Sequence, residues 1–183
     1  MALVDRVKNI LLTPKTEWPV IAGETATVQS LYVDYILILA AIGPLALIFA
    51  IGPVVAVISY AVSLAMVYLM AWVIDALSPT FGGEKNFARS LQLIAYSYTA
   101  AWVAGIFHLV PFIGSLLALA AGIYSLYTFY LGVPLMKKCP QEKAVAYTVV
   151  VVLCGIVAGA ILFNLLFSLL VGGSMMGMMG MGR

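Results

Sequence analysis

Long runs without charged residues alternate with short charged segments along the chain. Residues 35–74 and 90–136 contain no Asp, Glu, Lys or Arg, and after Lys143 the next charged residue is Arg183. A helix that crosses a membrane needs roughly 20 apolar residues. The first two runs are therefore each long enough for two crossings, and the third run holds one. The pattern predicts an all-α polytopic membrane bundle with five transmembrane helices.

Turn signals divide the two long runs. Ile51-Gly52-Pro53 separates the first span from the second, and Pro111-Phe112-Ile113-Gly114 separates the third from the fourth. Gly43-Pro44 then falls inside the first span, where a proline usually kinks the helix. The predicted spans cover approximately 31–51, 53–76, 90–109, 113–135 and 144–171.

The basic residues predict the orientation. Lys and Arg accumulate on the cytoplasmic side of membrane proteins. With five spans, eight of the nine basic residues fall on one side, and only Arg183 falls on the other. We therefore expect a cytoplasmic amino end and an external carboxyl end. The eight residues are Arg6, Lys8, Lys15, Lys85, Arg89, Lys137, Lys138 and Lys143.

Composition narrows the function classes. Of the 183 residues 64% are hydrophobic and 9% are charged, whereas a soluble domain carries about 25% charged residues. The net charge is only +2, and the basic residues lie where the topology requires them, so nucleic-acid binding is not expected. The sequence has no metal-spaced His/Cys cluster, no paired carboxylates within a span and no phosphate-binding loop. We therefore expect neither enzyme activity nor a cofactor.

Residues 1–30 form an amino-terminal arm. Val4, Val7, Ile10 and Leu11 follow helical spacing, as in a helix that lies in the membrane interface. Trp18, between two prolines, favours the depth of the lipid headgroups. The arm is either a docking segment for a lipid or protein partner or a simple anchoring helix.

Polar and aromatic residues concentrate in the cytoplasmic halves of the second, third and fourth spans. They either line a cavity open to the cytoplasm or the inner leaflet, or form interhelical hydrogen bonds with interfacial aromatics. Asp75 can reach Arg89 or Lys85 across the loop between the second and third spans. The candidate residues for binding a lipid or protein partner are Tyr68, Trp72, Asp75, Arg89, Gln92, Tyr96, Tyr124 and Tyr127.

Small residues mark two helix-packing faces. Ser125, Thr128 and Gly132 share one face of the fourth span, where another helix can approach closely. Gly155 and Gly159 form a GxxxG match in the fifth span. That match predicts either a homo-oligomer contact or packing within the chain.

Residues 172–183 form a Met/Gly-rich tail on the external side. Thioethers are soft ligands that suit Cu(I), although a disordered tail without a metal is the more common use of such a sequence. The weak candidates for metal ligands are Met175, Met176, Met178, Met179 and Met181.

Five segments, taken together, resemble the bacterial branch of the Yip (Ypt-interacting protein) family. They read ILLTPKTEWPVIAGE, FGGEKNFARSLQLIAYSYTAAWVAGI, PFIG, GIYSLYTFYLGVPLMKKCP and EKAVAYTVVVV. The resemblance implies five spans and an inner-membrane protein of bacteria with its amino end in the cytosol. Eukaryotic relatives act in vesicle traffic with prenylated GTPases, but their Asp-Leu-Tyr-Gly-Pro motif is absent here. Ala100 stands where many bacterial members have the proline that kinks the third span.

Two functions fit these features. The first is a non-enzymatic membrane protein that binds or organises membrane lipids, another membrane protein or further copies of itself through its cytoplasmic half. The second is a transporter or channel for a small solute or ion with a polar vestibule on the cytoplasmic side. A transporter is expected to carry a midplane site and often internal repeats, and the sequence shows no inverted repeat. Binding is therefore favoured.

Overall fold

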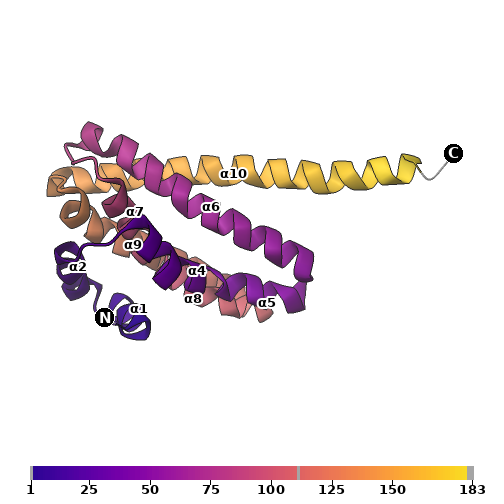
Figure 1. Ribbon diagram of the computed structural model, residues 1–183, viewed down its shortest axis with the longest axis horizontal. Helices are drawn as coiled ribbons and strands as arrows, with labels where there is room; N and C mark the ends of the chain where they lie inside the picture. The colour runs from indigo at the N-terminus through magenta and orange to yellow at the C-terminus, as the bar shows by residue number, and fades with distance from the viewer. Residues whose placement is uncertain (1, 111, 181–183) are drawn as a thin grey trace.

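The computed structural model is a bundle of helices and describes residues 2–110 and 112–180 (Figure 1). The side chains of His108 and of residues 166–180 lie outside this description. No strand occurs in the described residues, which confirms the all-α prediction. In chain order the elements are α1 (Leu3–Leu12), α2 (Pro14–Gly23), α3 (Val28–Leu31), the π-helix η1 (Tyr32–Ile36), α4 (Leu37–Ala40), α5 (Ile42–Ala50), α6 (Pro53–Leu77), the 3-10 helix η2 (Ser78–Phe81), α7 (Phe87–Ser97), α8 (Thr99–Ala104), the 3-10 helix η3 (Gly105–Leu109), α9 (Ile113–Lys137) and α10 (Gln141–Gly180).

Four helical stretches within the described residues are long and apolar enough to cross a membrane. They are Val28–Ala50, Pro53–Phe81, Ile113–Lys137 and Gln141–Leu165, and they overlap the first, second, fourth and fifth predicted spans. The predicted third span, 90–109, differs from the expectation because it is not one helix. It is divided among α7, α8 and η3, each too short to cross a membrane alone.

The break in this segment lies at Tyr98, although the proline that would kink it is replaced by Ala100. The Thr99 hydroxyl donates to the carbonyl oxygen of Tyr96 over 2.6 Å. A threonine hydroxyl bonded to the preceding turn competes with the helical hydrogen bonds and often bends a helix. The same hydroxyl lies 2.6 Å from the hydroxyl of Tyr35 in the first span, which fixes the bend against a neighbouring helix.

The first span is also interrupted, as the Gly43-Pro44 pair predicted. α4 ends at Ala40 and α5 begins at Ile42. Pro44 has no N–H to donate to the carbonyl of Ala40, so the regular helical pattern fails there. A Cβ on Gly43 would lie 3.7 Å from the Cα of Gly105. The glycine therefore lets α5 pack closely against η3.

The two turns inside the long uncharged runs lie where the sequence predicted them. Gly52 has a φ of 117°, a conformation that favours glycine, and α6 begins at the next residue, Pro53. Phe112 has a φ of 65° and precedes the first residue of α9. Both turns place apolar helices side by side with few residues between them.

The amino-terminal arm folds back onto the bundle, where α2 packs against α9 (Figure 1). The Trp18 side chain is only 1% exposed. A Cβ on Gly132 would lie 2.7 Å from Trp18 Cζ2 and 2.6 Å from Leu93 Cδ1. The Trp18 ring therefore packs inside the protein, in the space that Gly132 leaves open. That Trp18 lies at headgroup depth stays a prediction.

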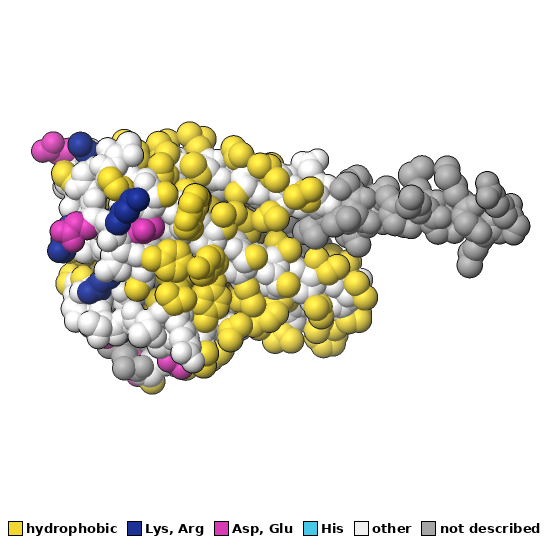
Figure 2. All heavy atoms as spheres, turned by 45° about the horizontal axis from the view of Figure 1, so that its top comes forward, with side chains coloured by type: hydrophobic (Ala, Val, Ile, Leu, Met, Phe, Trp, Pro, Cys, Tyr) yellow, Lys and Arg dark blue, Asp and Glu magenta, His cyan; other side chains and the backbone are white. Residues whose placement is uncertain are grey.

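Among the described residues, charged side chains gather at one end of the face shown in Figure 2, and apolar side chains predominate over the remainder. α10 extends beyond the other helices and remains helical to Gly180, past the predicted end of the fifth span at residue 171 (Figure 1). The candidate metal ligands of the tail, Met175, Met176, Met178, Met179 and Met181, lie outside the described side chains.

Candidate functional site

A buried ion-pair network holds the arm together. The guanidinium of Arg6 in α1 bonds to the carboxylate of Glu17 in α2 and to both carboxylate oxygens of Glu24. Asn9 Nδ2 donates to Glu17 Oε2 over 3.0 Å. Burial would lower the pKa of Arg6, but its bond to Glu24 and the nearby carboxylates raise that pKa above its ordinary value. Arg6 is therefore a permanent cation that joins α1 to both ends of α2.

This network contacts the bundle through aromatic rings. The Arg6 guanidinium lies 5.6 Å from the ring centroid of Tyr96 in α7, a distance typical of a cation–π contact. The ring of Tyr96 meets that of Tyr35 edge to face, with centroids 4.7 Å apart. Tyr35 in turn bonds to Thr99. The arm, the first span and the bend at Tyr98 are thus connected by successive contacts.

A cavity of about 770 Å³ opens beside these residues, between the arm, the first span and α7. We call it the arm cavity. Its polar lining consists of Arg6, Glu24, Thr25, Ser30, Asp34, Tyr35 and Tyr96, and its apolar lining includes Val33 and Ile38. Asp34 belongs to the π-helix η1, and such one-turn distortions occur frequently at functional sites.

Negative charge dominates the arm cavity. Of its lining residues, Glu24 and Asp34 are acidic and Arg6 is basic. The donors of Arg6 are directed at Glu24 and at Glu17, which does not line the cavity. Asp34 is exposed and has no ion-pair or hydrogen-bond partner in the described part of the chain. Tyr96 is 7% exposed and lines the cavity, and its hydroxyl donates no hydrogen bond to a described residue. The cavity therefore offers an unpaired carboxylate and an unused hydroxyl to a ligand.

A second polar cluster lies under the loop between α6 and α7. The sequence left open whether Asp75 reaches Arg89 or Lys85, and in the structure its ion-pair partner is Lys137 instead. Lys137 Nζ at the end of α9 lies 2.9 Å from Asp75 Oδ1 and also donates to Ser90 Oγ and to the Asn86 carbonyl. Asp75 and Lys137 are 62 positions apart in the sequence, so the pair was not predicted. The predicted topology places both residues at the same end of the bundle, which could have suggested it.

The other predicted candidates do not form one cluster. Arg89 donates hydrogen bonds to the Ile21 carbonyl over 3.3 Å and to Gln92 Oε1 over 3.4 Å. Arg89 therefore contacts the arm, through Ile21 of α2, and does not pair with Asp75. Tyr124 donates to the carbonyls of Ile10 and Leu11 at the end of α1.

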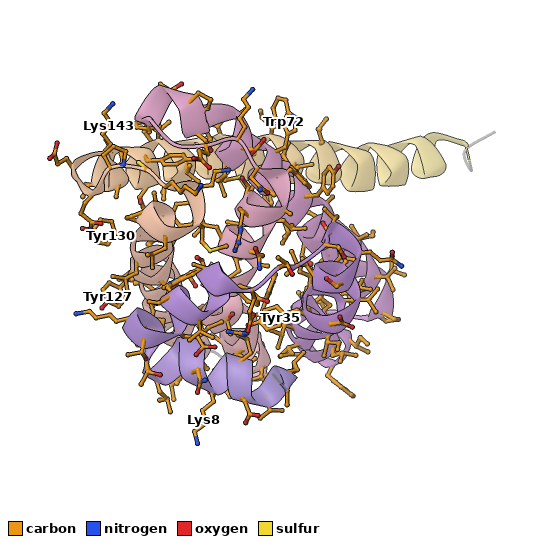
Figure 3. All side chains as sticks on the ribbon, turned by 60° about the vertical axis from the view of Figure 1, so that its left-hand side comes forward. Lys8, Tyr35, Trp72, Tyr127, Tyr130 and Lys143 are labelled. Atoms are coloured by element: carbon orange, nitrogen blue, oxygen red, sulfur yellow. The ribbon has the colours of Figure 1, made fainter. Side chains whose placement is uncertain are left out.

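The remaining aromatic candidates lie on the outside of the bundle. Trp72 is 60% exposed, and Tyr68 and Tyr127 are also exposed. Figure 3 shows Trp72 and Tyr127 at the periphery, whereas Tyr35 lies inside the bundle. Of the eight candidates, only Tyr96 lines the arm cavity.

The predicted packing residues occupy different environments. Ser125, Thr128 and Gly132 are buried against α7 and the arm, and Thr128 Oγ1 donates to the Ser97 carbonyl over 3.3 Å. A Cβ on Gly155 would lie 3.3 Å from Met70 of the same chain. A Cβ on Gly159 would meet nothing within 4 Å. The two glycines of the GxxxG match therefore do not share one contact.

Sequence reasoning missed most of the arm cavity. Arg6, Glu24, Asp34 and Tyr35 line it but were not among the candidates. The arm was expected to be a docking or anchoring segment, and no contact between it and the spans was predicted. One signal was available: Asp34 is the last charge before a run of 40 uncharged residues, 35–74. A charge at the edge of a span is a functional candidate by default.

The described residues contain no group of His, Cys, Asp and Glu that could hold a metal ion.

The family model of the Yip1 domain matches residues 8–162. The chain belongs to the Yip1 domain family. No curated protein and no solved structure matches it. The Yip1 match includes most of the arm, α6, α7 and α9. The residues that line the arm cavity from Gly23 to Tyr96 therefore lie within the family domain.

Proposed function

We propose that this Yip1 domain protein is a non-enzymatic membrane protein that binds a lipid with a cationic amine headgroup in the arm cavity. The observation that carries the proposal is the combination, in one cavity, of an unpaired carboxylate, an unused tyrosine hydroxyl and an apolar wall. Asp34 and Tyr96 supply the polar groups, and Val33 and Ile38 supply the wall.

The charge of the cavity favours a cation. Arg6 is already bonded to Glu17 and Glu24, so it has little capacity left to bind an anion. Asp34 and the outer part of Glu24 are acceptors that a primary ammonium can bond through several N–H groups. A phosphate next to that ammonium would find the hydroxyl of Tyr96 as a donor.

The position of the cavity favours a lipid over a soluble amine. Val33 and Ile38 are both more than half exposed and belong to the first candidate span. In a membrane these side chains face acyl chains, so a lipid can place its headgroup in the cavity while its chains follow the apolar wall. Phosphatidylethanolamine has this combination of groups.

We further propose five crossings, with the amino end in the bacterial cytoplasm and the carboxyl end outside. The segment 87–109 supports the fifth crossing, because Ser90 lies near Lys137 at one end of the bundle and Gly105 lies near Gly43 at the other. Its 23 residues would extend about 34 Å at about 1.5 Å per residue. Positive residues on one side support the orientation.

The test is native mass spectrometry of the protein reconstituted in nanodiscs of phosphatidylethanolamine and phosphatidylglycerol in equal amounts. We expect wild type to retain phosphatidylethanolamine preferentially. Asp34→Asn and Glu24→Gln should reduce that preference several-fold, because each removes a negative charge without changing the shape. Asp5→Asn is the matched control, since Asp5 is exposed on α1 and does not line the cavity.

Three outcomes would contradict lipid binding. Equal retention of both lipids by wild type and Asp34→Asn would show that the cavity does not select an amine. A protein that co-purifies from native membranes and is lost in Asp34→Asn would replace the lipid by a protein partner. Solute flux in liposomes that Asp34→Asn abolishes would establish transport instead.

A further inference from the structure

A second concave site lies between other elements, and no residue of the arm lines it. It has a volume of about 480 Å³ and is lined by residues of α6, α7, α8, α9 and α10. We call it the lateral groove and define it by Met70, Ser97, Ala101, Gly122, Ser125 and Gly155. Small-molecule sites typically measure about 300–1,000 Å³ and combine an apolar lining with a few polar groups. The lateral groove fits this description.

Two serine hydroxyls in this groove lack partners. Ser97 is 1% exposed and Ser125 is 7% exposed. Neither Oγ atom has a hydrogen-bond partner in the described part of the chain. Serine and threonine hydroxyls in helices usually bond to a carbonyl of the preceding turn, and Ser78 and Thr128 do so in this protein. Buried polar groups without partners are rare and call for an explanation.

Their depth restricts the chemistry of a ligand. Ser125 is the middle residue of α9, twelve residues from Ile113 and twelve from Lys137. At about 1.5 Å per residue, each end of the helix lies about 18 Å away. The hydrocarbon core of a bilayer is about 30 Å thick, so Ser125 lies near its centre. Charged and zwitterionic headgroups cannot remain at this depth without a large desolvation cost.

We propose that the lateral groove binds a neutral, lipid-soluble carbonyl compound of the quinone class. The Oγ atoms of Ser97 and Ser125 are buried behind the groove wall in this structure. On rotation of the two side chains toward the groove, these hydroxyls, on adjacent helices, would donate hydrogen bonds to the carbonyl oxygens of the ligand, and its apolar tail would lie along the groove. Gly122 leaves room for the ring, because a Cβ there would meet nothing within 4 Å. The proposal concerns binding alone and is independent of the arm cavity, which opens between other elements.

The probe is decylubiquinone, titrated into protein in phosphatidylglycerol nanodiscs. Binding is followed by quenching of tryptophan fluorescence, and the stoichiometry is measured by native mass spectrometry. We expect one molecule per chain. Ser97→Ala and Ser125→Ala should each weaken binding by about 2- to 10-fold, the range for one lost hydrogen bond. Without quinone these variants should be at least as stable as wild type, because each removes a buried hydroxyl that has no partner.

Two pairs of variants sharpen the test. Ser115→Ala changes an exposed serine of the same helix and should leave the affinity unchanged. Gly122→Leu should fill the groove and abolish binding. Gly159→Leu is its control, since both glycines have open space around a new Cβ but only Gly122 lines the groove. Asp34→Asn should leave quinone binding unchanged, which separates this site from the arm cavity.

Three results would overturn the proposal. The first is unchanged quinone affinity in both serine variants. The second is equally tight binding of decylbenzene, which has the tail but no carbonyl oxygens and would identify a site for acyl chains. The third is a change from dimer to monomer in Gly122→Leu without quinone binding by wild type, which would make the groove a contact between two copies of the chain.

Discussion

Asp75 and Lys137 form an ion pair of 2.9 Å although 62 positions separate them in the sequence. The lysine side chain is 0% exposed, whereas the carboxylate is partly exposed. Asp75 Oδ1 also accepts hydrogen bonds from the Asn86 amide and from the Ser90 hydroxyl. This pair therefore ties the end of α6 to the start of α7 and the end of α9, at the charged end of the bundle.

Removal of Asp75 should destabilise the protein strongly. Asp75→Ala leaves the ammonium of Lys137 buried without a counter-ion, which typically costs about 3–5 kcal/mol. The measurement is thermal or denaturant-induced unfolding in detergent. Glu84→Ala is the control, since Glu84 pairs with Lys138 across 2.8 Å on the surface, where an ion pair contributes at most about 1 kcal/mol. Equal losses in the two variants would contradict the role of burial.

Arg6 offers a second test of buried charge. Arg6→Met should detach the arm and destabilise the protein by about 3–5 kcal/mol, because Glu17 stays buried without its partner. The double variant Arg6→Met, Glu17→Leu should recover much of that loss, since a buried ion pair can be replaced by apolar side chains at little cost. Limited proteolysis within residues 1–26 would report the release of the arm. A double variant no better than Arg6→Met would contradict this interpretation.

The contact of Gly132 with Trp18 predicts a marked difference between two glycines of α9. Gly132→Ala should destabilise by about 1–3 kcal/mol, because a Cβ would overlap Trp18 and Leu93. Gly122→Ala should be neutral or stabilise by up to about 1 kcal/mol, since nothing lies within 4 Å and alanine favours the helix. Unfolding in detergent measures both changes. Similar values for the two variants would contradict the packing of the arm on α9 in the detergent-solubilised protein.

Cysteine labelling can count the crossings. In a chain whose own Cys139 and Cys154 are replaced by Ala, single cysteines are introduced by Lys15→Cys, Lys85→Cys and Phe112→Cys and treated with a membrane-impermeant maleimide. Five crossings predict that Phe112→Cys reacts from outside and the other two react from the cytoplasm. Reaction of all three from one side would show that the segment 87–109 does not cross.

Both native cysteines are free thiols, and Cys154 lies near the middle of the candidate span Gln141–Leu165, where a membrane-impermeant reagent does not reach it. Cys139 is buried, and burial raises the pKa of its thiol. A raised pKa leaves less of the reactive thiolate at any given pH. In the otherwise native chain, Cys139 should therefore react more slowly than an exposed cysteine at residue 15.

The hydrophobic pattern alone determined the fold class and four of the helices that can cross a membrane. In lipid, a long uncharged segment must form a helix, because only its own backbone can supply the hydrogen bonds that water no longer provides. The uncharged runs and the Gly and Pro residues between them are therefore enough to predict these helices. Gly52 and Phe112 stand at the two predicted turns for that reason. The interruption of the first span near Pro44 also follows from local chemistry.

Only the tertiary structure decided where the polar groups meet. Arg6 pairs with Glu17 and Glu24, and Lys137 pairs with Asp75. Trp18 fills the space beside Gly132. These contacts form because the fold brings the arm and the ends of the helices together from distant parts of the chain. Periodicity assigns a residue to a face of its own helix, but not to a partner on another. The bend at Tyr98 likewise depends on Thr99 and on its contact with Tyr35. Both cavities lie between elements, so no single segment of sequence contains them.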